Sequence, residues 1–198
     1  YEYIRHLGYY CTESSEHNAE YNPWFIKSRY PEMIDEFNIP LDEYPRRCIK
    51  QIEGWEKERA DILRDGKITH ERSKEYASYI MEAVVTDQPY KIGGNVRNDG
   101  YIENLPGDAC VEVPCYVDGT GVHPTKVGKL PAHLAAMNAV NIGVQLMTIE
   151  AAVTKERKKI YQAAMLDPHT AAELNIGDII KMCDELIESH GEYMKDYR

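Results

Sequence analysis

The sequence predicts an α+β fold that is mainly helical, with a small β-sheet in the middle of the chain. Residues 39–66 and 134–153 carry apolar side chains at helical spacing over long stretches. Residues 91–117 instead break into short alternating or β-branched segments that turn residues separate. With 198 residues, 43% of them hydrophobic, the chain can form one good-sized domain, or a domain with an arm, around a core.

The N-terminal residues predict short elements. Residues 1–7 are typical of the end of a helix, and Gly8 suits the left-handed position that follows one. Residues 9–25 predict a loop or strand and then a short turn broken at Pro23, while residues 31–37 predict one or two helical turns. Because the chain begins within an element, we expect it to be a fragment of a longer protein.

Two helices are expected before the sheet. The first should begin after Ile39, with acids in its first turn where the helix dipole favours them, and end at Asp65-Gly66. A second should start between His70 and Ser73 and run to Val85, with an apolar face that we interpret as part of the core. The first helix has apolar or aromatic side chains at roughly helical spacing: Tyr44, Cys48, Ile52, Trp55, Ile62 and Leu63.

The second half of the chain predicts strands and then helices. Cys110–Val117 alternates in polarity, and Pro114 favours a place for this strand at a sheet edge or bulge. Leu134–Val153 is almost free of charge, so this helix should lie at the centre of the domain or in a subunit interface. Lys155–Met165 and Asp178–His190 are amphipathic and should flank it.

Composition limits the classes of partner and compartment. The 23 basic and 33 acidic residues give a formal charge of −10, which argues against nucleic acid or an anionic membrane as the main partner. No apolar run reaches the length that crossing a membrane requires. The five cysteines are scattered without a CxxC pair, which fits neither a disulfide framework nor a zinc knuckle and favours a reducing cytoplasm.

The most informative polar cluster lies in residues 12–25. It contains three glutamates, His17 and Tyr21, and no Lys or Arg occurs between Arg5 and Lys27. Uncompensated acids beside an imidazole and aromatic rings can handle protons, a metal or a sugar. An acidic surface loop with a buried Trp behind it is the alternative. A metal site built only from Glu16, His17 and Glu20 would lack support from a second cluster at ligand spacing.

A second polar cluster spans residues 95–104. Arg97 can donate hydrogen bonds to sugar hydroxyls, and Asn98 and Asn104 can both donate and accept them. Turn formation alone also explains Asn98-Asp99-Gly100. No phosphate-binding glycine motif accompanies these residues, since Gly119-Thr120-Gly121 lacks the third glycine.

Taken together, these segments resemble the NAD- and manganese-dependent α-galactosidases of glycoside hydrolase family 4. The resemblance extends in the same order over essentially all 198 residues. It rests on Gly8-Tyr9-Tyr10, Thr12 to His17, Glu20 to Phe25, Pro40 to Pro45, Gly94 to Gly100, Asn104-Leu105-Pro106, Val111-Glu112-Val113, Pro124 to Gly128, Leu130-Pro131 and Asp167 to Ala172.

The resemblance implies that residues 1–198 are the C-terminal, substrate-side and oligomerisation domain of such an enzyme. This domain is similar in fold to the C-terminal domain of lactate and malate dehydrogenases. The family's N-terminal Rossmann domain, which binds most of the NAD and Mn²⁺, would then precede this chain, so we expect no cofactor or metal ligands here. An α-galactoside substrate, a cytoplasmic location and a homo-oligomer are implied as well.

The implied chemistry begins with oxidation at C3 of the galactoside by NAD. A base then removes the acidified proton from C2, the group on C1 leaves, water adds, and the hydride is returned. Relatives place the base in the segment that holds Ser14, Ser15 and Glu16 here, so the base itself cannot be transferred by motif. We expect Glu16 or His17 to be the base or its orienting partner, with Tyr21 and Tyr1 as further candidates.

Several alternatives remain open at this point. Arg97, Asn98 and Asn104 would contact the substrate or the neighbouring domain. The acidic stretch argues for an uncharged sugar, although an α-galacturonidase or α-glucosidase of the same family is the alternative. A non-catalytic, self-associating fragment is the alternative outside the enzyme class.

Overall fold

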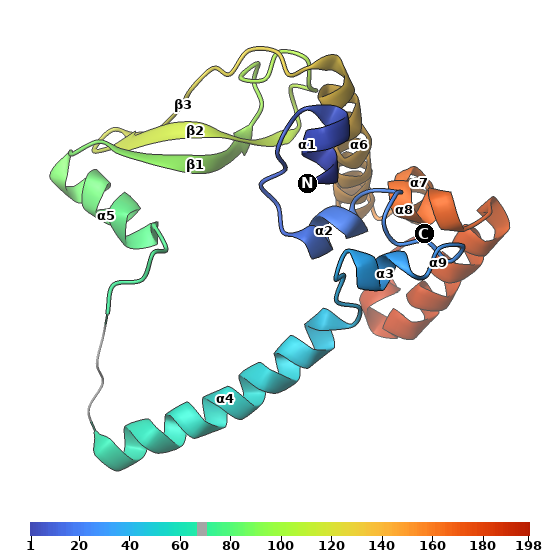
Figure 1. Ribbon diagram of the computed structural model, residues 1–198, viewed down its shortest axis with the longest axis horizontal. Coiled ribbons are helices and arrows are strands. Elements are labelled where there is room, and N and C mark those ends of the chain that lie inside the picture. The colour runs from blue at the N-terminus through green and yellow to red at the C-terminus, as the bar shows by residue number, and fades with distance from the viewer. Residues whose placement is uncertain (67–70) are drawn as a thin grey trace.

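The computed structural model describes residues 1–66 and 71–198. Figure 1 shows a small sheet beside one long central helix, a C-terminal group of helices, and a single helix that projects from the body. The expected α+β class with dominant helices is confirmed. The elements in chain order are α1 (Glu2–Leu7), α2 (Ser15–Glu20), α3 (Met33–Glu36), α4 (Glu43–Asp65), α5 (Ala77–Thr86), β1 (Tyr90–Arg97), β2 (Cys110–Asp118), β3 (Gly121–Pro124), α6 (Ala132–Thr154), α7 (Arg157–Leu166), α8 (Pro168–Glu173), α9 (Ile176–His190) and the 3₁₀ helix η1 (Gly191–Met194).

The three strands form an antiparallel sheet in the order β1-β2-β3. The prediction of an edge or bulge for β2 is wrong, because β2 pairs on both sides. Pro114 is tolerated there because it lies just beyond Cys115↔Pro124, the last pair between β2 and β3. Its carbonyl accepts hydrogen bonds from Thr125 N at 2.9 Å and Thr125 Oγ1 at 2.7 Å. Proline has no backbone N–H to donate, and at Pro114 none is needed because the β2–β3 ladder has already ended.

The core lies between one face of the sheet and α6. Residues of β2 alternate strictly, and Val111, Val113, Cys115 and Val117 are the buried set. Ile142 of α6 closes this cluster, with Leu146 beside it. The predicted central position of α6 is confirmed, since it packs on the sheet and on α7. Some of its apolar side chains still face outward: Val140, Ile149 and Val153.

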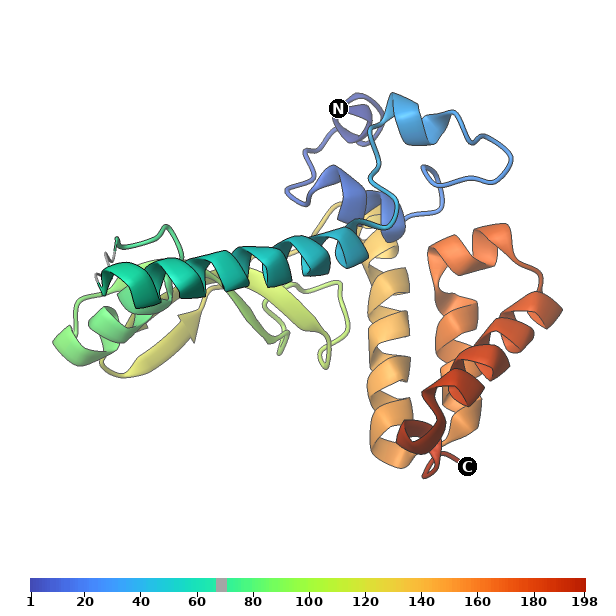
Figure 2. The ribbon, with the colours of Figure 1, turned by 90° about the horizontal axis from the view of Figure 1, so that it is seen from below.

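The C-terminal helices form a separate layer beside α6 (Figure 2). Asp167 caps α8 by accepting a hydrogen bond from Thr170 N, and Asn175 caps α9 in the same way from Gly177 N and Asp178 N. The apolar face of α9 is buried at Ile179, Cys183 and Ile187, at successive spacings of four residues. The two amphipathic helices expected after residue 154 are therefore confirmed.

The N-terminal elements cover one end of α6. Gly8 has a φ of 78°, which confirms the left-handed position after α1. Residues 15–20 form helix α2, whereas a loop or strand was predicted there. Ser14 explains this helix, because its side chain accepts a hydrogen bond from His17 N at the helix start. Trp24, which the alternative of an acidic surface loop would bury, is 46% exposed and packs edge-on against the ring of Tyr3.

The loop before α3 is anchored to the C-terminal layer. Both the N–H and the hydroxyl of Ser28 donate to a carboxylate oxygen of Glu173 on α8, at 3.0 and 2.6 Å. Lys27 Nζ lies 3.3 Å from the other oxygen of the same carboxylate. The Ser28 hydrogen bonds, with Lys27, lower the pKa of Glu173 to about 2.

Helix α4 leaves the body beside α3 and extends alone to its far end (Figure 1). Its bounds match the prediction, and Gly66 adopts the left-handed conformation after it. In the described chain, α4 shares no extensive packing with another element, and residues 49–60 are exposed on every side. Helix α5 begins at Ala77, later than predicted, and His70, the first predicted start, lies outside the described residues.

Candidate functional site

The acidic cluster of the sequence is organised by helix α2. His17 Nδ1 lies 3.0 Å from Glu20 Oε2, one helical turn away, and this pair is solvent-exposed. The hydrogen bond to Glu20 raises the pKa of His17, and the charges of Glu20, Glu13 and Glu16 act in the same direction. The stretch therefore holds an imidazole whose charged form is favoured.

A cavity of about 550 Å³ opens between the N-terminal segment and α6. Its α6 wall carries the amide side chains of Asn138, Asn141 and Gln145, and its opposite wall carries tyrosines and Glu13. No Lys, Arg or His lines it among the described residues. Amides and phenols both donate and accept hydrogen bonds, so this lining suits a neutral, hydroxyl-rich molecule.

A second cavity of about 320 Å³ adjoins the first under α1. The two share five lining residues: Tyr3, Tyr10, Cys11, Glu13 and Asn18. Asn18 is fixed by its neighbours, because Cys11 Sγ donates to Asn18 Oδ1 at 3.4 Å and Asn22 Nδ2 donates to the Asn18 carbonyl at 2.8 Å. The wall between the cavities is thus held in place by local polar contacts.

Tyr3 stands at this shared wall with a buried hydroxyl. No described residue makes a well-formed hydrogen bond to that hydroxyl. Burial raises the pKa of Tyr3, and the nearby Asn18 amide opposes the shift only in part. A buried phenol without a partner is a group that a bound polar molecule can satisfy.

The predicted catalytic residues are divided between these features. Tyr1 lines the smaller cavity and Tyr21 the larger one. Glu16 and His17 line neither; Glu16 is half-buried on α2 and His17 is exposed beside it. The Tyr21 carbonyl accepts a hydrogen bond from Asn141 Nδ2 at 3.4 Å, which ties the end of α2 to the α6 wall.

The predicted sugar contacts of residues 95–104 lie elsewhere. Asn98 is 0% exposed, and its Nδ2 donates to the carbonyls of Ile102, Leu105 and Pro106 at 2.9–3.0 Å. Its side chain is saturated within the loop, so the expectation of a substrate contact is corrected to a structural role. Arg97 is exposed and pairs with Asp99 at 3.2 Å.

Asn104 also forms an internal link. Its Nδ2 donates to the Leu130 carbonyl and its Oδ1 accepts from Leu130 N, both at 2.9 Å. Because Leu130 lines the larger cavity, Asn104 fixes the rim of that cavity from behind. Direct contact of Asn104 with a ligand is not required for this role.

The sequence reasoning missed the amides of α6. Asn138, Asn141 and Gln145 follow Leu134 at spacings of four, three and four residues, which places them on one face of the helix. A polar stripe on an otherwise apolar helix is a readable signal. This stripe was overlooked because α6 was predicted to be buried on most sides.

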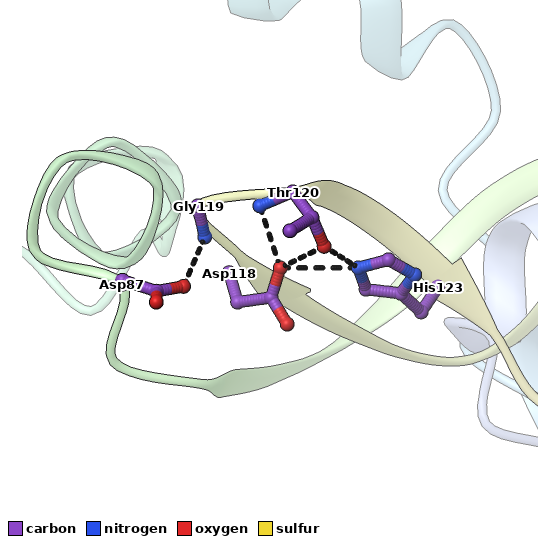
Figure 3. A network of polar contacts seen from close by, with 5 residues as sticks. All are labelled: Asp87, Asp118, Gly119, Thr120 and His123. Atoms are coloured by element: carbon purple, nitrogen blue, oxygen red, sulfur yellow. Dashed lines mark hydrogen bonds and ion pairs between the residues drawn. The ribbon is translucent and has the colours of Figure 1, made fainter.

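A third polar network closes the β2–β3 hairpin (Figure 3). Asp118 Oδ1 accepts from Thr120 N at 2.8 Å and from Thr120 Oγ1 at 2.6 Å, and His123 Nε2 lies 3.1 Å away. The Thr120 and His123 hydrogen bonds lower the pKa of Asp118 to about 2. Asp87 holds the same turn by accepting from Gly119 N at 3.0 Å, so this network is a turn and not a reaction centre.

The described residues, 1–66 and 71–198, contain neither a cluster of potential metal ligands nor a helix fit to span a membrane. Within them, no group of three or more His, Cys, Asp or Glu residues is arranged to hold a metal ion. No helix of this part combines the length and the apolar character needed to cross a membrane.

Comparison with known proteins decides the family. Residues 1–170 match the family 4 glycosyl hydrolase C-terminal domain. The chain belongs to this family. It is 59% identical over all 198 residues to the α-galactosidase of Bacillus subtilis, of which it spans 46%. The chain thus corresponds to less than half of that curated relative.

Solved structures of the family share the fold of this C-terminal domain. One is the 6-phospho-β-glucosidase of Thermotoga maritima with manganese, NAD⁺ and glucose-6-phosphate, at 27% identity and a TM-score of 0.57, over 83% of this chain and 40% of that one. Another is a 6-phospho-α-glucosidase from gut microorganisms with NAD and glucose-6-phosphate. It is 26% identical, with a TM-score of 0.63 over 74% of this chain and 35% of the other.

Proposed function

We propose that this family 4 chain forms the substrate side of an α-galactosidase that works by oxidation, elimination, addition and reduction. The observation that carries the proposal is the larger cavity, with its amide and phenol lining and no cation among the described residues. The B. subtilis α-galactosidase, 59% identical along the whole chain, supports the same substrate class.

The lining favours an uncharged sugar over the charged sugars of related enzymes. Solved relatives hold glucose-6-phosphate, and a phosphate or a uronic acid is best bound by Arg or Lys. Asn138, Asn141 and Gln145 instead offer both donors and acceptors. Discrimination of a galactoside by such hydrogen-bonding groups is strong, because a mismatched sugar leaves buried polar groups unpaired.

The proton at C2 is the group on which this chain acts in the proposed mechanism. We assign its removal to Glu16 or His17, with the other residue as orienting partner. Both lie on α2 outside the larger cavity, beside Asn18, which lines it. Tyr21, which lines the cavity, and Tyr1 are further candidates. His17 is already oriented by Glu20 at 3.0 Å, as a catalytic imidazole is oriented by a carboxylate. A base must be deprotonated to act, so the raised pKa of His17 shifts its useful range to higher pH.

The remaining parts of the site belong to residues outside this chain. When bound, NAD and Mn²⁺ would supply the reversible oxidation at C3 and stabilise the charge that follows loss of the C2 proton. We assign residues 1–198 to one substrate-side and oligomerisation domain of a cytoplasmic homo-oligomer. The five cysteines, all free in the structure, agree with a reducing compartment.

The test is an assay of the full-length protein with p-nitrophenyl α-galactoside, with and without NAD and Mn²⁺. Activity should require both additives and should fall by at least about a hundredfold in Glu16→Gln or His17→Asn, because loss of a general base costs that much. Activity that survives removal of both additives would overturn the redox mechanism. Unchanged rates in both variants would overturn the assignment of the base.

A further inference from the structure

The smaller cavity, under α1, is lined by aromatic rings and a few polar groups. Its volume is about 320 Å³, and its walls come from α1, α2 and the residues on either side of α3. Cavities of this size and character are typical of small-molecule sites. The rings in its lining belong to Tyr1, Tyr3, Tyr10, Phe25 and Phe37.

The ring of Phe25 is held in place by its neighbours. Its centroid lies 5.3 Å from that of Phe37, edge-on, and 5.8 Å from that of Tyr3. Polar groups of Ser15 and Asn18, on α2, line the same cavity. A pyranose ring has apolar C–H faces and a rim of hydroxyls, so fixed aromatic rings beside hydroxyl and amide groups suit a sugar.

Charge restricts the class of sugar. No Lys, Arg or His of the described chain lines the smaller cavity, whereas the carboxylates of Glu2 and Glu13 do. A phosphate or a uronic acid is best bound by Arg or Lys, and these carboxylates would repel either anion. A neutral sugar instead offers hydroxyls that carboxylates can accept from.

Tyr3 lies where the two cavities meet, since it lines both of them. Its hydroxyl is buried, and no described residue makes a well-formed hydrogen bond to it. Buried polar groups are normally paired, so a molecule that extends from one cavity into the other would supply the missing partner. The substrate of a glycosidase has two parts, the sugar that reacts and the group that leaves from its C1.

We propose that the smaller cavity binds the leaving group of the substrate, in the form of a second neutral hexose. The galactosyl ring then lies in the larger cavity among the amides of α6, and the Tyr3 hydroxyl bonds the disaccharide where the two cavities meet. This assignment rests on the proposed function, because only a glycoside that is cleaved has a leaving group to place.

The test compares two α-galactosides with the full-length protein, NAD and Mn²⁺. Melibiose, in which α-galactose is joined to glucose, has a hexose as its leaving group, whereas methyl α-galactoside loses only methanol. Phe25→Ala removes a ring from the smaller cavity, so kcat/KM for melibiose should fall about tenfold. The kcat/KM for methyl α-galactoside should change by less than about twofold.

Tyr30→Ala is the matched control. It removes a ring from the same segment of chain, but Tyr30 is 46% exposed and lines neither cavity. The kcat/KM for both glycosides should therefore stay at the wild-type value. Equal losses for the two glycosides in Phe25→Ala would overturn the assignment of the smaller cavity.

Tyr3→Phe keeps the test decisive if Phe25→Ala fails to fold. The ring stays and only an unpaired hydroxyl is lost, so the melting temperature should not fall. The kcat/KM for melibiose should nevertheless fall about tenfold through loss of a hydrogen bond to the substrate. A kcat/KM for melibiose that stays unchanged in either variant would overturn the assignment.

Binding measurements separate this inference from the proposed function. Isothermal titration of the full-length protein with each glycoside requires no turnover. If only the proposed reaction is wrong, melibiose should still bind at least about tenfold more tightly than methyl α-galactoside, and Phe25→Ala should remove that difference. Equal affinities in a protein that hydrolyses both glycosides would overturn this inference alone. Binding of neither glycoside would overturn both.

Discussion

Asn98 and Ile102 close the loop after β1 through two hydrogen bonds that run in opposite directions. Ile102 N donates to Asn98 Oδ1 at 2.7 Å, and Asn98 Nδ2 donates to the Ile102 carbonyl at 2.9 Å. Both residues are buried, and Ile102 belongs to the core between the sheet and α6. One side chain therefore fixes the path of the chain from the sheet towards the cavity rim.

Replacing Asn98 should therefore lower the stability of the folded protein. Asn98→Ala removes the amide and leaves buried backbone carbonyls without a donor, so the free energy of unfolding should fall by about 3 kcal/mol. Chemical denaturation measures this change. Asn95→Ala, at an exposed position of β1, is the matched control and should stay within about 0.5 kcal/mol of wild type. Equal losses in the two variants would contradict the structural role of Asn98.

The amides of α6 should determine the affinity for the sugar. Asn138→Ala and Gln145→Ala each remove hydrogen bonds to the substrate, so the KM for p-nitrophenyl α-galactoside should rise about tenfold in each. Steady-state kinetics of the full-length protein measures the change. Gln88→Ala removes an exposed amide that does not line the cavity, so it should leave KM unchanged. A KM that stays constant in both cavity variants would place the sugar elsewhere.

His17 should titrate above its ordinary pKa because Glu20 stabilises the imidazolium. Its folded-state pKa exceeds the unfolded value, so the contribution to stability is present below the unfolded pKa and is lost as pH rises through the folded pKa. NMR titration of the imidazole should show the pKa falling in Glu20→Gln. Glu188→Gln, on α9, should not change it. A pKa that is the same in wild type and Glu20→Gln would show that the pair does not form in solution.

The pKa of Asp118 should be shifted in the opposite direction, below its ordinary value. Its folded pKa of about 2 lies below the ordinary value of 3.8, so its contribution to stability is present above the unfolded pKa and is lost as pH falls towards 2. Thr120→Val removes the hydroxyl that bonds Asp118 and should raise the pKa, as measured by NMR titration of the carboxyl. Thr148→Val, on α6, is the control. No change in Thr120→Val would contradict the network of Figure 3.

Much of the fold could be predicted because its signals are local. The bounds of α4, the left-handed Gly8 and the alternation of Val111 to Val117 each follow from periodicity or from backbone freedom. The helix α2 was missed because its start depends on one cap, Ser14, in a stretch with no apolar period. The central place of β2 was missed because it depends on the pairing of β2 with β3, which the sequence of β2 alone does not show.

The site was harder to predict because contact and burial decide it. Sequence alone could not separate Asn98, saturated inside a loop, from the amides of α6, which face a cavity. Both are polar residues near turns or apolar runs, and only packing distinguishes their roles. The aromatic and apolar residues of α4 were correctly placed on a helix, yet the sequence did not show that Ile52 and Trp55 would be exposed.

Deuterium incorporation at C2 of the galactose product tests the central claim most directly. The full-length protein should hydrolyse p-nitrophenyl α-galactoside in D₂O with NAD and Mn²⁺, and NMR or mass spectrometry should locate the label. If the proton at C2 is removed and later replaced from solvent, the released galactose should carry deuterium at C2. Release of galactose without deuterium at C2 would contradict the mechanism and, with it, the proposed role of the acidic stretch.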